Sequence, residues 1–256
     1  ASAKESSYRA VLNERALAEM VAALEASERF AFDTETTGLD PLRADLVGLS
    51  FAVTAGEAWY VPVSHRYLGV PEQLPLDKVL AAVGPLLGSA EHLKIGQNLK
   101  YDILVMGRVG VAVTEPLFDT MLASYLANSA AQSHGMDSLA TELLDYRTIP
   151  YSEVAGSGKK KICFDEVEVE KATVYAAEDA DITLRLYEKL LPMIAEQEQQ
   201  ELFDNVEMAL LPILVKMEQA GIRIDAELLN GLSADMEKKL AALEVEIHGL
   251  AGTTFN

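Results

Sequence analysis

Several common features are scarce or missing in this 256-residue sequence. Cys163 is the single cysteine, so no disulfide can form within the chain, and this usage is typical of a reducing cytoplasm. No apolar run approaches the length that a transmembrane helix needs. The first ten residues are polar and of mixed charge, without the apolar segment of a secretory signal. We therefore expect a cytoplasmic chain of one or two domains with no membrane partner.

Basic residues are also scarce. Lysine and arginine together number 21, against 40 aspartates and glutamates, which gives a net charge of −19. Phosphate contacts normally need a basic surface, so the sequence predicts that this chain alone binds nucleic acid weakly. Such acidity usually serves solubility, but carboxylates that hold divalent cations would change the local sign of the charge. Half of the residues are hydrophobic, which is enough for a sizeable core.

The hydrophobic pattern predicts an α/β or α+β domain built on one sheet. Strands are expected over residues 29–35, 46–53, 57–63 and 91–95, and helices over 17–24, 76–87, 98–106, 119–127, 136–144 and 167–191. The second and third strands should pair as a hairpin, because a short, glycine-containing link separates them. Pro192 should end the last of these helices.

The C-terminal part of the chain, residues 201–250, is almost wholly helical in pattern. Gly221 should end one helix, and Asp225 should cap the next. Before this part, residues 155–161 contain two glycines and three lysines, and we expect a basic loop there.

Asp33 and Glu35 lie two residues apart on a predicted strand, so both carboxylates project from the same face. Their neighbours are mostly apolar, and two like charges beside a core are costly unless something neutralises them. A hard divalent cation such as magnesium or manganese does this well. Taken alone, the pair is equally consistent with a solvated strand end.

Two further acidic residues, Asp179 and Asp102, lie on predicted helices. Tyr175 and Asp179 lie four residues apart in a predicted helix, so the phenol and the carboxylate share one face. Ala176 and Ala177 between them are small enough to let this helix approach a sheet closely. Asp102 lies in the first turn of another predicted helix, where the helix dipole alone is a sufficient reason for an aspartate. Each of these observations has an ordinary structural explanation by itself.

The combination is specific, because the three segments occur together and in order. They are Phe32-Asp33-Thr34-Glu35-Thr36-Thr37-Gly38-Leu39, Gly96-Gln97-Asn98-Leu99-Lys100-Tyr101-Asp102 and Tyr175-Ala176-Ala177-Glu178-Asp179-Ala180-Asp181. The chain resembles the exonucleases with four acidic residues and a tyrosine, the DEDDy group. Within that group it is most similar to the 3′→5′ proofreading domain of bacterial family A DNA polymerases, over nearly its whole length. Phe118-Asp119-Thr120-Met121-Leu122 and Met136-Asp137-Ser138-Leu139-Ala140 belong to this likeness.

The resemblance implies a ribonuclease H-like mixed central sheet flanked by helices, and a site with two divalent metal ions, Mg²⁺ or Mn²⁺, with Zn²⁺ as an alternative at one position. Asp33, Glu35 and Asp179 would hold the first metal, and Asp33 and Asp102 the second, Asp102 largely through water. In such sites the metals lie about 4 Å apart and activate the attacking water. Tyr175 would orient that water, because an ordinary phenol, with a pKa near ~10, is a poor base at neutral pH.

The same resemblance implies a substrate site for single-stranded DNA or a frayed primer 3′ end. Leu39 and Tyr151 would hold the terminal bases without reading sequence, and Gln97, Asn98 and Tyr101 would line the path of the strand. Ser133 stands where close relatives carry an arginine near the scissile phosphate, so one phosphate contact is expected to be absent. The run Lys159, Lys160 and Lys161 could meet phosphates, although such a run is more often only a solvated loop.

The implied domains are an exonuclease domain over residues 1–195 and a truncated, helical start of the polymerase thumb over residues 196–256. No polymerase motif follows, so we expect a monomeric fragment without polymerase activity. Its partner in the parent protein would be the missing polymerase portion. Two alternatives remain. One is an RNA 3′ exonuclease of the ribonuclease D type, although such enzymes continue into a different helical domain. The other is a binding or scaffold domain with weak or no catalysis, which the complete acidic set argues against.

Overall fold

The computed structural model describes residues 6–255. Residues 1–5, which form half of the polar N-terminal stretch considered above, lie outside the described part. The chain divides into two compact units, one ending at Gln219 and the other beginning at Ala220. Within the described residues, no helix is both long enough and apolar enough to cross a membrane.

One mixed sheet forms the centre of the first unit. Its strands are β1 (Ser7–Ala10), β2 (Arg29–Thr36), β3 (Leu46–Thr54), β4 (Glu57–Pro62), β5 (Leu93–Gly96) and β6 (Leu117–Asp119), and they lie in the order β1-β4-β3-β2-β5-β6. The pairs β2–β3 and β3–β4 are antiparallel, whereas β1–β4, β2–β5 and β5–β6 are parallel. The predicted hairpin of residues 46–63 is therefore confirmed.

The two strands at the edges of the sheet were not expected from the sequence. Strand β1 has four residues and β6 has three, and both are too short to show a period of their own. Each pairs with a parallel neighbour. Parallel strands are not joined by a hairpin turn, so the sequence contains no local signal for these pairings. Asp119, predicted to begin a helix, ends β6 and also caps the helix that follows.

The helices follow the predicted ranges closely. In chain order the first unit contains α1 (Glu14–Glu25), α2 (Leu76–Leu87), α3 (Leu99–Arg108), α4 (Thr120–Ala127), α5 (Met136–Leu144), α6 (Tyr151–Ala155), α7 (Val169–Glu196), α8 (Gln200–Leu202) and α9 (Ala209–Ala220), with a π-helical turn over Phe203–Met208. The helical turn α6 is an addition to the predicted set. The basic loop is present, and it includes a short 3₁₀ turn over Gly158–Lys160.

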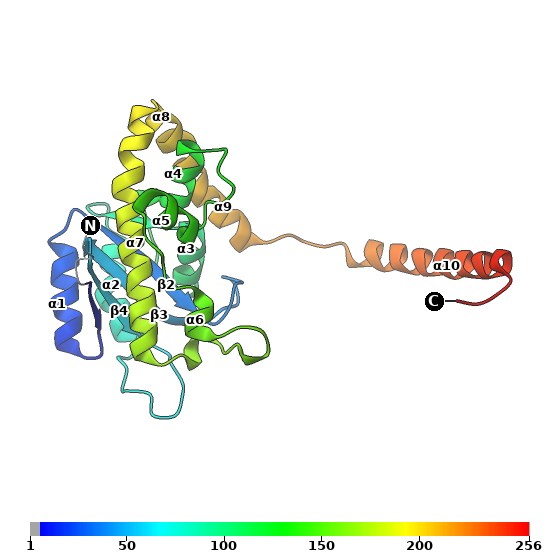
Figure 1. Ribbon diagram of the computed structural model, residues 1–256, viewed down its shortest axis with the longest axis horizontal. Helices are drawn as coiled ribbons and strands as arrows, with labels where there is room; N and C mark the ends of the chain where they lie inside the picture. The colour runs from blue at the N-terminus through cyan, green and yellow to red at the C-terminus, as the bar shows by residue number, and fades with distance from the viewer. Residues whose placement is uncertain (1–5, 256) are drawn as a thin grey trace. The chain divides into compact units, whose positions relative to one another are not determined.

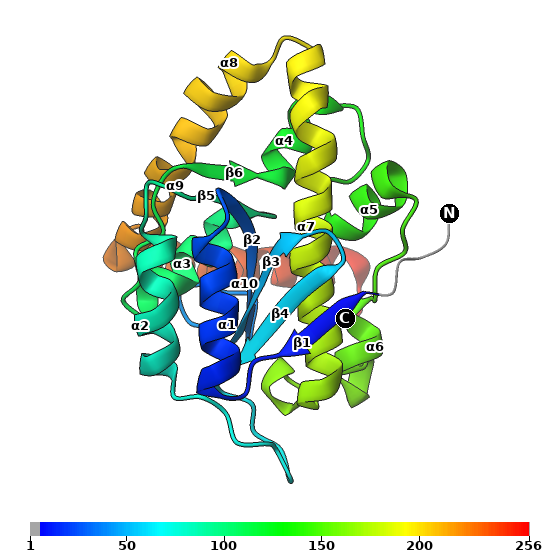
Figure 2. The ribbon, with the colours of Figure 1, turned by 90° about the vertical axis from the view of Figure 1, so that its left-hand side faces the viewer.

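The longest helix of this unit, α7, packs across one face of the sheet. It contacts β1 to β5, and Figure 1 shows it running in front of the strands. In Figure 2 the strands lie between α7 on one side and α1 and α2 on the other. Ala176, Ala177 and Ala180 are fully buried on α7, so the helix backbone approaches the sheet closely, as their small size predicts. The core between these layers includes the rings of Phe30 and Phe51.

Pro192 does not end α7, contrary to the prediction. The helix continues to Glu196, one turn beyond the proline. Pro192 lies on the exposed side of this last turn, while Leu190 and Ile194 on either side of it are buried in the core. A proline removes one helical hydrogen bond, and here the burial of its neighbours outweighs that loss.

The second unit consists mainly of helix α10 (Ala226–Ala251). Asp225 caps its first turn, accepting a hydrogen bond from the Leu228 amide at 3.0 Å, and Gly221 adopts a positive φ of 71°, as the sequence predicts for a helix stop and start. Large apolar residues along α10 are exposed, among them Leu228, Leu232, Met236, Leu240, Leu243, Ile247 and Leu250.

Candidate active site

The floor of the site is formed by strand β2. Asp33 and Glu35 project from the same face of this strand, opposite to Phe32 and Thr34, because side chains alternate along it. The backbone of β2 is paired with β3 at both carboxylate positions, and with β5 over Arg29 to Ala31, just before them. The ladder is interrupted between Glu35 and Thr36, where the register with β3 shifts. The two carboxylates thus lie on a rigid strand that loses its regular pairing immediately after them.

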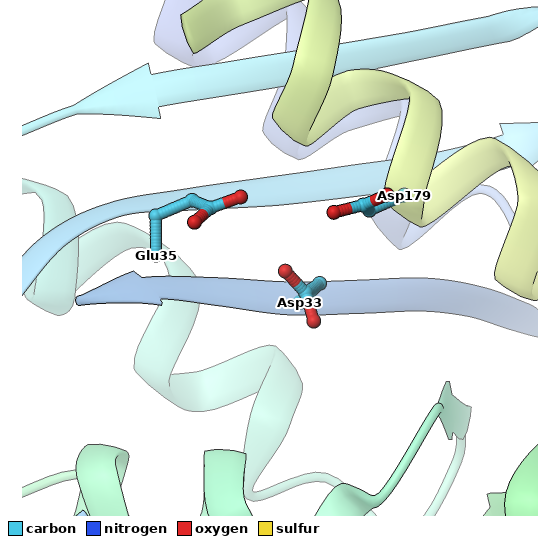
Figure 3. A group of neighbouring side chains, drawn as sticks. All are labelled: Asp33, Glu35 and Asp179. Atoms are coloured by element: carbon cyan, nitrogen blue, oxygen red, sulfur yellow. The ribbon is translucent and has the colours of Figure 1, made fainter. Parts of the chain in front are cut away.

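Helix α7 brings a third carboxylate to this strand. Oxygen atoms of Asp33, Glu35 and Asp179 all lie within 4.8 Å of one another. Figure 3 shows the three carboxylates directed into one space between β2 and α7. Tyr175, one turn earlier on the same helix, lines the same pocket. The predicted convergence of these side chains is therefore present in the structure.

Asp102, the fourth carboxylate, comes from the first turn of α3. It is not one of the group of three, but it lines the same pocket. Its Oδ1 accepts hydrogen bonds from the Thr34 amide at 3.0 Å and from the Thr34 hydroxyl at 2.6 Å. This contact joins the start of α3 to β2, so that Asp102 has a fixed position relative to Asp33.

The ionisation of the four carboxylates is strongly perturbed. Burial raises the pKa of Asp33 to about 7. Burial, and after it the charges of Asp33, Asp179 and Asp102, raise the pKa of Glu35 well above its usual range. Burial and then the charge of Asp33 do the same to the pKa values of Asp102 and Asp179. Ionising all four groups together is therefore unfavourable unless their charge is offset.

These four groups fit a divalent cation site. Glu35 Oε1 is buried and has no hydrogen-bond partner within the described residues. A buried carboxylate oxygen without a partner is costly, and a hard cation is the natural ligand for several carboxylate oxygens at once. Bound cations would also reverse the like-charge repulsion among Asp33, Glu35 and Asp179. The residues that could hold such ions are these three together with Asp102.

Tyr175 faces the carboxylates with its phenol protonated. Burial and then the charges of Asp179, Glu35 and Asp33 raise the pKa of Tyr175 far above its ordinary value. A phenol in this setting donates or accepts a hydrogen bond, and it does not serve as a base at neutral pH. This agrees with an orienting role for the hydroxyl.

The pocket is lined by all the residues that the sequence assigned to metal binding, catalysis and contact with the strand, whereas Ser133, Lys159 and Lys160 lie outside it. It has a volume of about 620 Å³. Its lining includes Asp33, Glu35, Leu39, Gln97, Asn98, Tyr101, Asp102, Tyr151, Tyr175 and Asp179. Residues 161–163 line it as well, from the end of the basic loop and the two residues that follow it.

One rim of the pocket is the loop that follows β2. Leu39 at its tip is 94% exposed, which leaves an apolar side chain free to contact a ligand in the pocket. The loop is anchored by Tyr101, whose hydroxyl donates to the Gly38 carbonyl at 2.6 Å and lies 2.5 Å from the Thr36 hydroxyl. Tyr101 therefore acts on the position of Leu39, in addition to lining the pocket.

Tyr151 and Tyr175 form an aromatic wall on another side of the pocket, and a small second core supports it. The ring centroid of Tyr151 lies 6.1 Å from that of Tyr175 and 6.2 Å from that of Phe164. Beneath these rings are Tyr60 and Ala176, both fully buried. The wall thus links α6 to α7.

Gln97 and Asn98 begin α3 at another side of the pocket. Gln97 Nε2 donates to the His134 carbonyl at 2.8 Å, which connects the site to the loop before α5. Asn98 adopts a left-handed conformation with a φ of 59°, which asparagine tolerates better than most residues. Ser133 does not line the pocket, and its hydroxyl accepts a hydrogen bond from the Gly135 amide at 3.2 Å.

Several residues with structural influence on the site were missed by the sequence analysis. Thr34 lies within the first motif, but its bond to Asp102 has no sequence signature. Glu178 is buried and accepts hydrogen bonds from the Tyr146 hydroxyl at 2.7 Å and the Ile149 amide at 2.6 Å, which fixes the segment leading to Tyr151. Its position next to Asp179, in a motif already noted, was the available signal.

Comparison with known proteins places this geometry in a family. Residues 8–195 match the family model described as 3′-5′ exonuclease. The chain belongs to the 3′-5′ exonuclease family. It is 44% identical to DNA polymerase I of Pseudomonas aeruginosa over 97% of this chain and 28% of that protein. It is 42% identical to DNA polymerase I of Rhizobium leguminosarum over 88% of this chain and 24% of that protein. It thus spans about a quarter of the length of these curated relatives of the exonuclease family.

Solved structures show the same fold. The POL domain of Pol1 from M. smegmatis, in complex with DNA primer-template and dNTP, matches with a TM-score of 0.74 at 20% identity, covering 97% of this chain and 38% of that one. Escherichia coli RNase D matches with a TM-score of 0.63 at 17% identity, covering 82% of this chain and 51% of that one. The predicted ribonuclease H-like arrangement of a mixed sheet and flanking helices is confirmed. The family match, and not the fold alone, identifies this chain as an exonuclease domain, which makes it an enzyme.

Proposed function

We propose that this chain removes nucleotides from the 3′ end of single-stranded or frayed DNA, as the proofreading part of a DNA polymerase I. The observation that carries the proposal is the convergence of Asp33, Glu35 and Asp179 within 4.8 Å, beside a tyrosine and in one pocket. The names of the polymerase I relatives support DNA as the substrate over RNA. The likeness to RNase D is one of fold, and it makes RNA the alternative to test.

The carboxylates are assigned to two divalent cations. Asp33, Glu35 and Asp179 would hold one cation, and Asp33 and Asp102 would hold the other, Asp102 largely through water. A neighbour in fold, Brucella melitensis NrnC, has been solved with bound Mg²⁺, and this supports magnesium as the first choice. When bound, such a pair of ions supplies Lewis acidity and a water of lowered pKa.

The remaining residues of the site bind and orient the reactants. The Tyr175 hydroxyl keeps its proton and holds the attacking water by a hydrogen bond, so that the water oxygen is aligned with the scissile phosphorus. The water oxygen forms a bond to phosphorus and gives up a proton to solvent, while the bond from phosphorus to the 3′ oxygen of the preceding nucleotide breaks. That oxygen takes up a proton and stays on the shortened strand, and the terminal nucleotide leaves as a 5′-monophosphate. Leu39 and Tyr151 hold unpaired bases by apolar contact and stacking, which requires no particular sequence. The amides of Gln97 and Asn98 contact the strand.

Selection of mispaired ends follows from the shape of such a site. A mismatched terminus frays at a lower free-energy cost than a paired one, and the pocket accepts a single strand.

The domains are proposed as an exonuclease domain over residues 1–195 and the start of a polymerase thumb over residues 196–256. The polymerase portion of such a protein would be the partner that presents the primer end, since the net charge of −19 predicts weak DNA binding by this chain alone.

The test is a digestion of 5′-labelled single-stranded DNA with magnesium. We expect a ladder of products shortened from the 3′ end, and its loss in Asp33→Ala and in Asp179→Ala. Asp77→Ala, an exposed aspartate in the first turn of α2, is the matched control and should retain activity. Faster cleavage of an RNA oligomer of the same sequence would favour the ribonuclease reading. Activity that survives in both site variants would overturn the assignment of the carboxylates.

A further inference from the structure

Lys161 is the cationic side chain among the residues that line the acidic pocket. The other lining residues are acidic, polar, apolar or aromatic. All three lysines of the basic loop are exposed, but Lys159 and Lys160 do not line the pocket. The lysine run, which could be read as nothing more than a solvated loop, therefore has two different parts in the folded protein.

The backbone of the basic loop gives Lys161 this position. The Ile162 amide donates to the Ala155 carbonyl at 2.9 Å, which closes the loop at its base. Gly156 has a φ of 73°, and a Cβ there would lie 2.8 Å from the Lys160 carbonyl oxygen, so a glycine is needed for the chain to fold back. The loop thus returns the chain to the pocket at Lys161, and Ile162 and Cys163, which follow it, line the pocket as well.

The Lys161 ammonium lies beside the aromatic wall. Its Nζ is 5.2 Å from the centroid of the Tyr151 ring, a distance at which a cation is attracted to the ring face. Among the ion pairs formed by residues 6–255, none includes Lys161. The charge is therefore available to an anion from outside the protein, in a pocket whose own charges are otherwise negative.

We propose that Lys161 binds a phosphate of the substrate strand on the 5′ side of the scissile linkage. This inference rests on the proposed function. The carboxylates and Tyr175 mark the scissile phosphate, whereas the ammonium lies over Tyr151, whose ring centroid is 6.1 Å from that of Tyr175. A nucleotide whose base stacks on the aromatic wall would bring its backbone phosphate within reach of the flexible lysine stem.

The phosphate contact proposed for Lys161 is important because Ser133, where close relatives carry an arginine, provides none. Ser133 lies outside the pocket and its hydroxyl is bonded within its own loop, so it supplies no charge to the site. A strand of phosphates that enters a pocket of four carboxylates needs cationic partners to offset repulsion. Lys161 is the protein's own contribution of that kind among the lining residues. It is a specificity-determining residue for strands longer than one nucleotide.

The experiment compares Lys161→Gln with two matched controls, Lys160→Gln and Lys159→Gln, which remove the same charge from the same loop. One substrate is a 5′-labelled single-stranded oligonucleotide. The other is the p-nitrophenyl ester of thymidine 5′-phosphate, which carries only the scissile phosphate. Binding of the oligonucleotide is measured separately by fluorescence anisotropy in calcium, so that affinity is known independently of turnover.

For Lys161→Gln we expect KM and Kd for the oligonucleotide to rise about tenfold, the effect of one charge-assisted hydrogen bond to a phosphate, with kcat within about twofold. The slope of log Kd against log salt should decrease by about 0.7, the value for one phosphate of a single strand. Lys161→Arg should restore binding. The controls should stay within about twofold of the unmodified protein, and no variant should change cleavage of the nitrophenyl ester.

Three results would overturn the proposal while leaving the proposed function intact. They are an unchanged Kd in Lys161→Gln, equal losses in all three glutamine variants, or an equal loss on the nitrophenyl ester. The proposed function itself would fail if the unmodified protein, with magnesium, cleaved neither substrate. In that case the anisotropy measurement still decides whether Lys161 contributes to binding of the strand.

Discussion

Thr34 holds Asp102 by two hydrogen bonds to a single oxygen. The amide and the hydroxyl of Thr34 both donate to Asp102 Oδ1, at 3.0 Å and 2.6 Å. These bonds lower the pKa of Asp102, but burial and the charge of Asp33 outweigh them and keep it high. A strand residue whose side chain points away from Asp33 and Glu35 thus fixes the carboxylate that completes the site.

We predict that Thr34→Val reduces kcat for single-stranded DNA about tenfold, because one charge-assisted bond to Asp102 is lost while the volume and the strand preference are kept. Thr34→Ser retains a hydroxyl and should keep most of the activity. The measurement is steady-state cleavage under saturating magnesium. Equal activity of the valine and serine variants would show that the hydroxyl does not position Asp102.

The stability of the metal-free protein should depend on pH through Asp33. Burial raises its folded-state pKa to about 7, from an ordinary 3.8 in the unfolded chain. The stabilisation that comes from this raised pKa is fully present below the pKa of the unfolded state, and it is lost as the pH rises through the pKa of the folded state. In EDTA, the Tm of the unmodified protein should therefore fall relative to that of Asp33→Asn as pH rises from about 5 to about 8.

Two further expectations concern His65 and magnesium. The lowered pKa of His65, caused mainly by burial, acts in the opposite direction but is common to both proteins, so it cancels in the difference. Magnesium should raise the Tm of the unmodified protein most at the alkaline end, because cations bind the ionised carboxylates. A constant Tm difference between the two proteins across this range would contradict the assignment of a raised pKa to Asp33.

Gly48 is the residue opposite Glu35 in the β2–β3 pair, and the ring of Tyr60 occupies the space where its side chain would be. A Cβ at position 48 would lie 2.2 Å from the Tyr60 hydroxyl oxygen, which is itself bonded to His65 Nε2 at 2.7 Å. We predict that Gly48→Ala lowers the free energy of unfolding by about 3 kcal/mol or more. Urea denaturation measures this.

The control for Gly48→Ala is the same substitution in a Tyr60→Leu background. Without the ring, the added methyl group has room, so the penalty should shrink to less than about 1 kcal/mol in a double-mutant cycle. Additive effects of the two substitutions would show that the steric conflict with Tyr60 is not the cause.

Asp119 should be important for stability although it lies outside the reaction centre. Its carboxylate accepts hydrogen bonds from four amides, those of Asn98 (3.2 Å), Leu99 (2.7 Å), Met121 (2.8 Å) and Leu122 (3.3 Å). It thereby satisfies the first turns of both α3 and α4. We predict that Asp119→Ala costs about 2–4 kcal/mol and Asp119→Asn about half of that, measured by urea denaturation. A cost below about 0.5 kcal/mol for the alanine variant would refute this role.

The convergence of the site could be anticipated from the sequence because its parts are local. The alternation of β2 places Asp33 and Glu35 on one face, and helical spacing places Tyr175 and Asp179 on one face of α7. Strands and helices longer than about eight residues were also predictable, since their hydrophobic periods are complete. The family resemblance then supplied the order in which these faces meet.

What could not be anticipated depends on pairing between distant segments. Strand β1 is recognised only by its parallel register with β4, which places Ser7 opposite Glu57. The passage of α7 through Pro192 depends on the burial of Leu190 and Ile194 against the rest of the fold. The separate position of Lys161 within a run of three lysines depends on how the loop closes at Ala155. None of these contacts has a local signature in the sequence.

Asp181 gives α7 a fixed register along the sheet. This fully buried carboxylate accepts hydrogen bonds from the Tyr8 hydroxyl and the Gly56 amide, both at 2.7 Å, and is paired with Arg185 on its own helix. It lies half a turn beyond Asp179, so a slide of the helix that displaced the reactive carboxylate would have to break all of these bonds at once. The edge strand β1 thus holds in place the helix that carries Asp179, although β4 and β3 lie between β1 and the reactive strand β2 in the sheet.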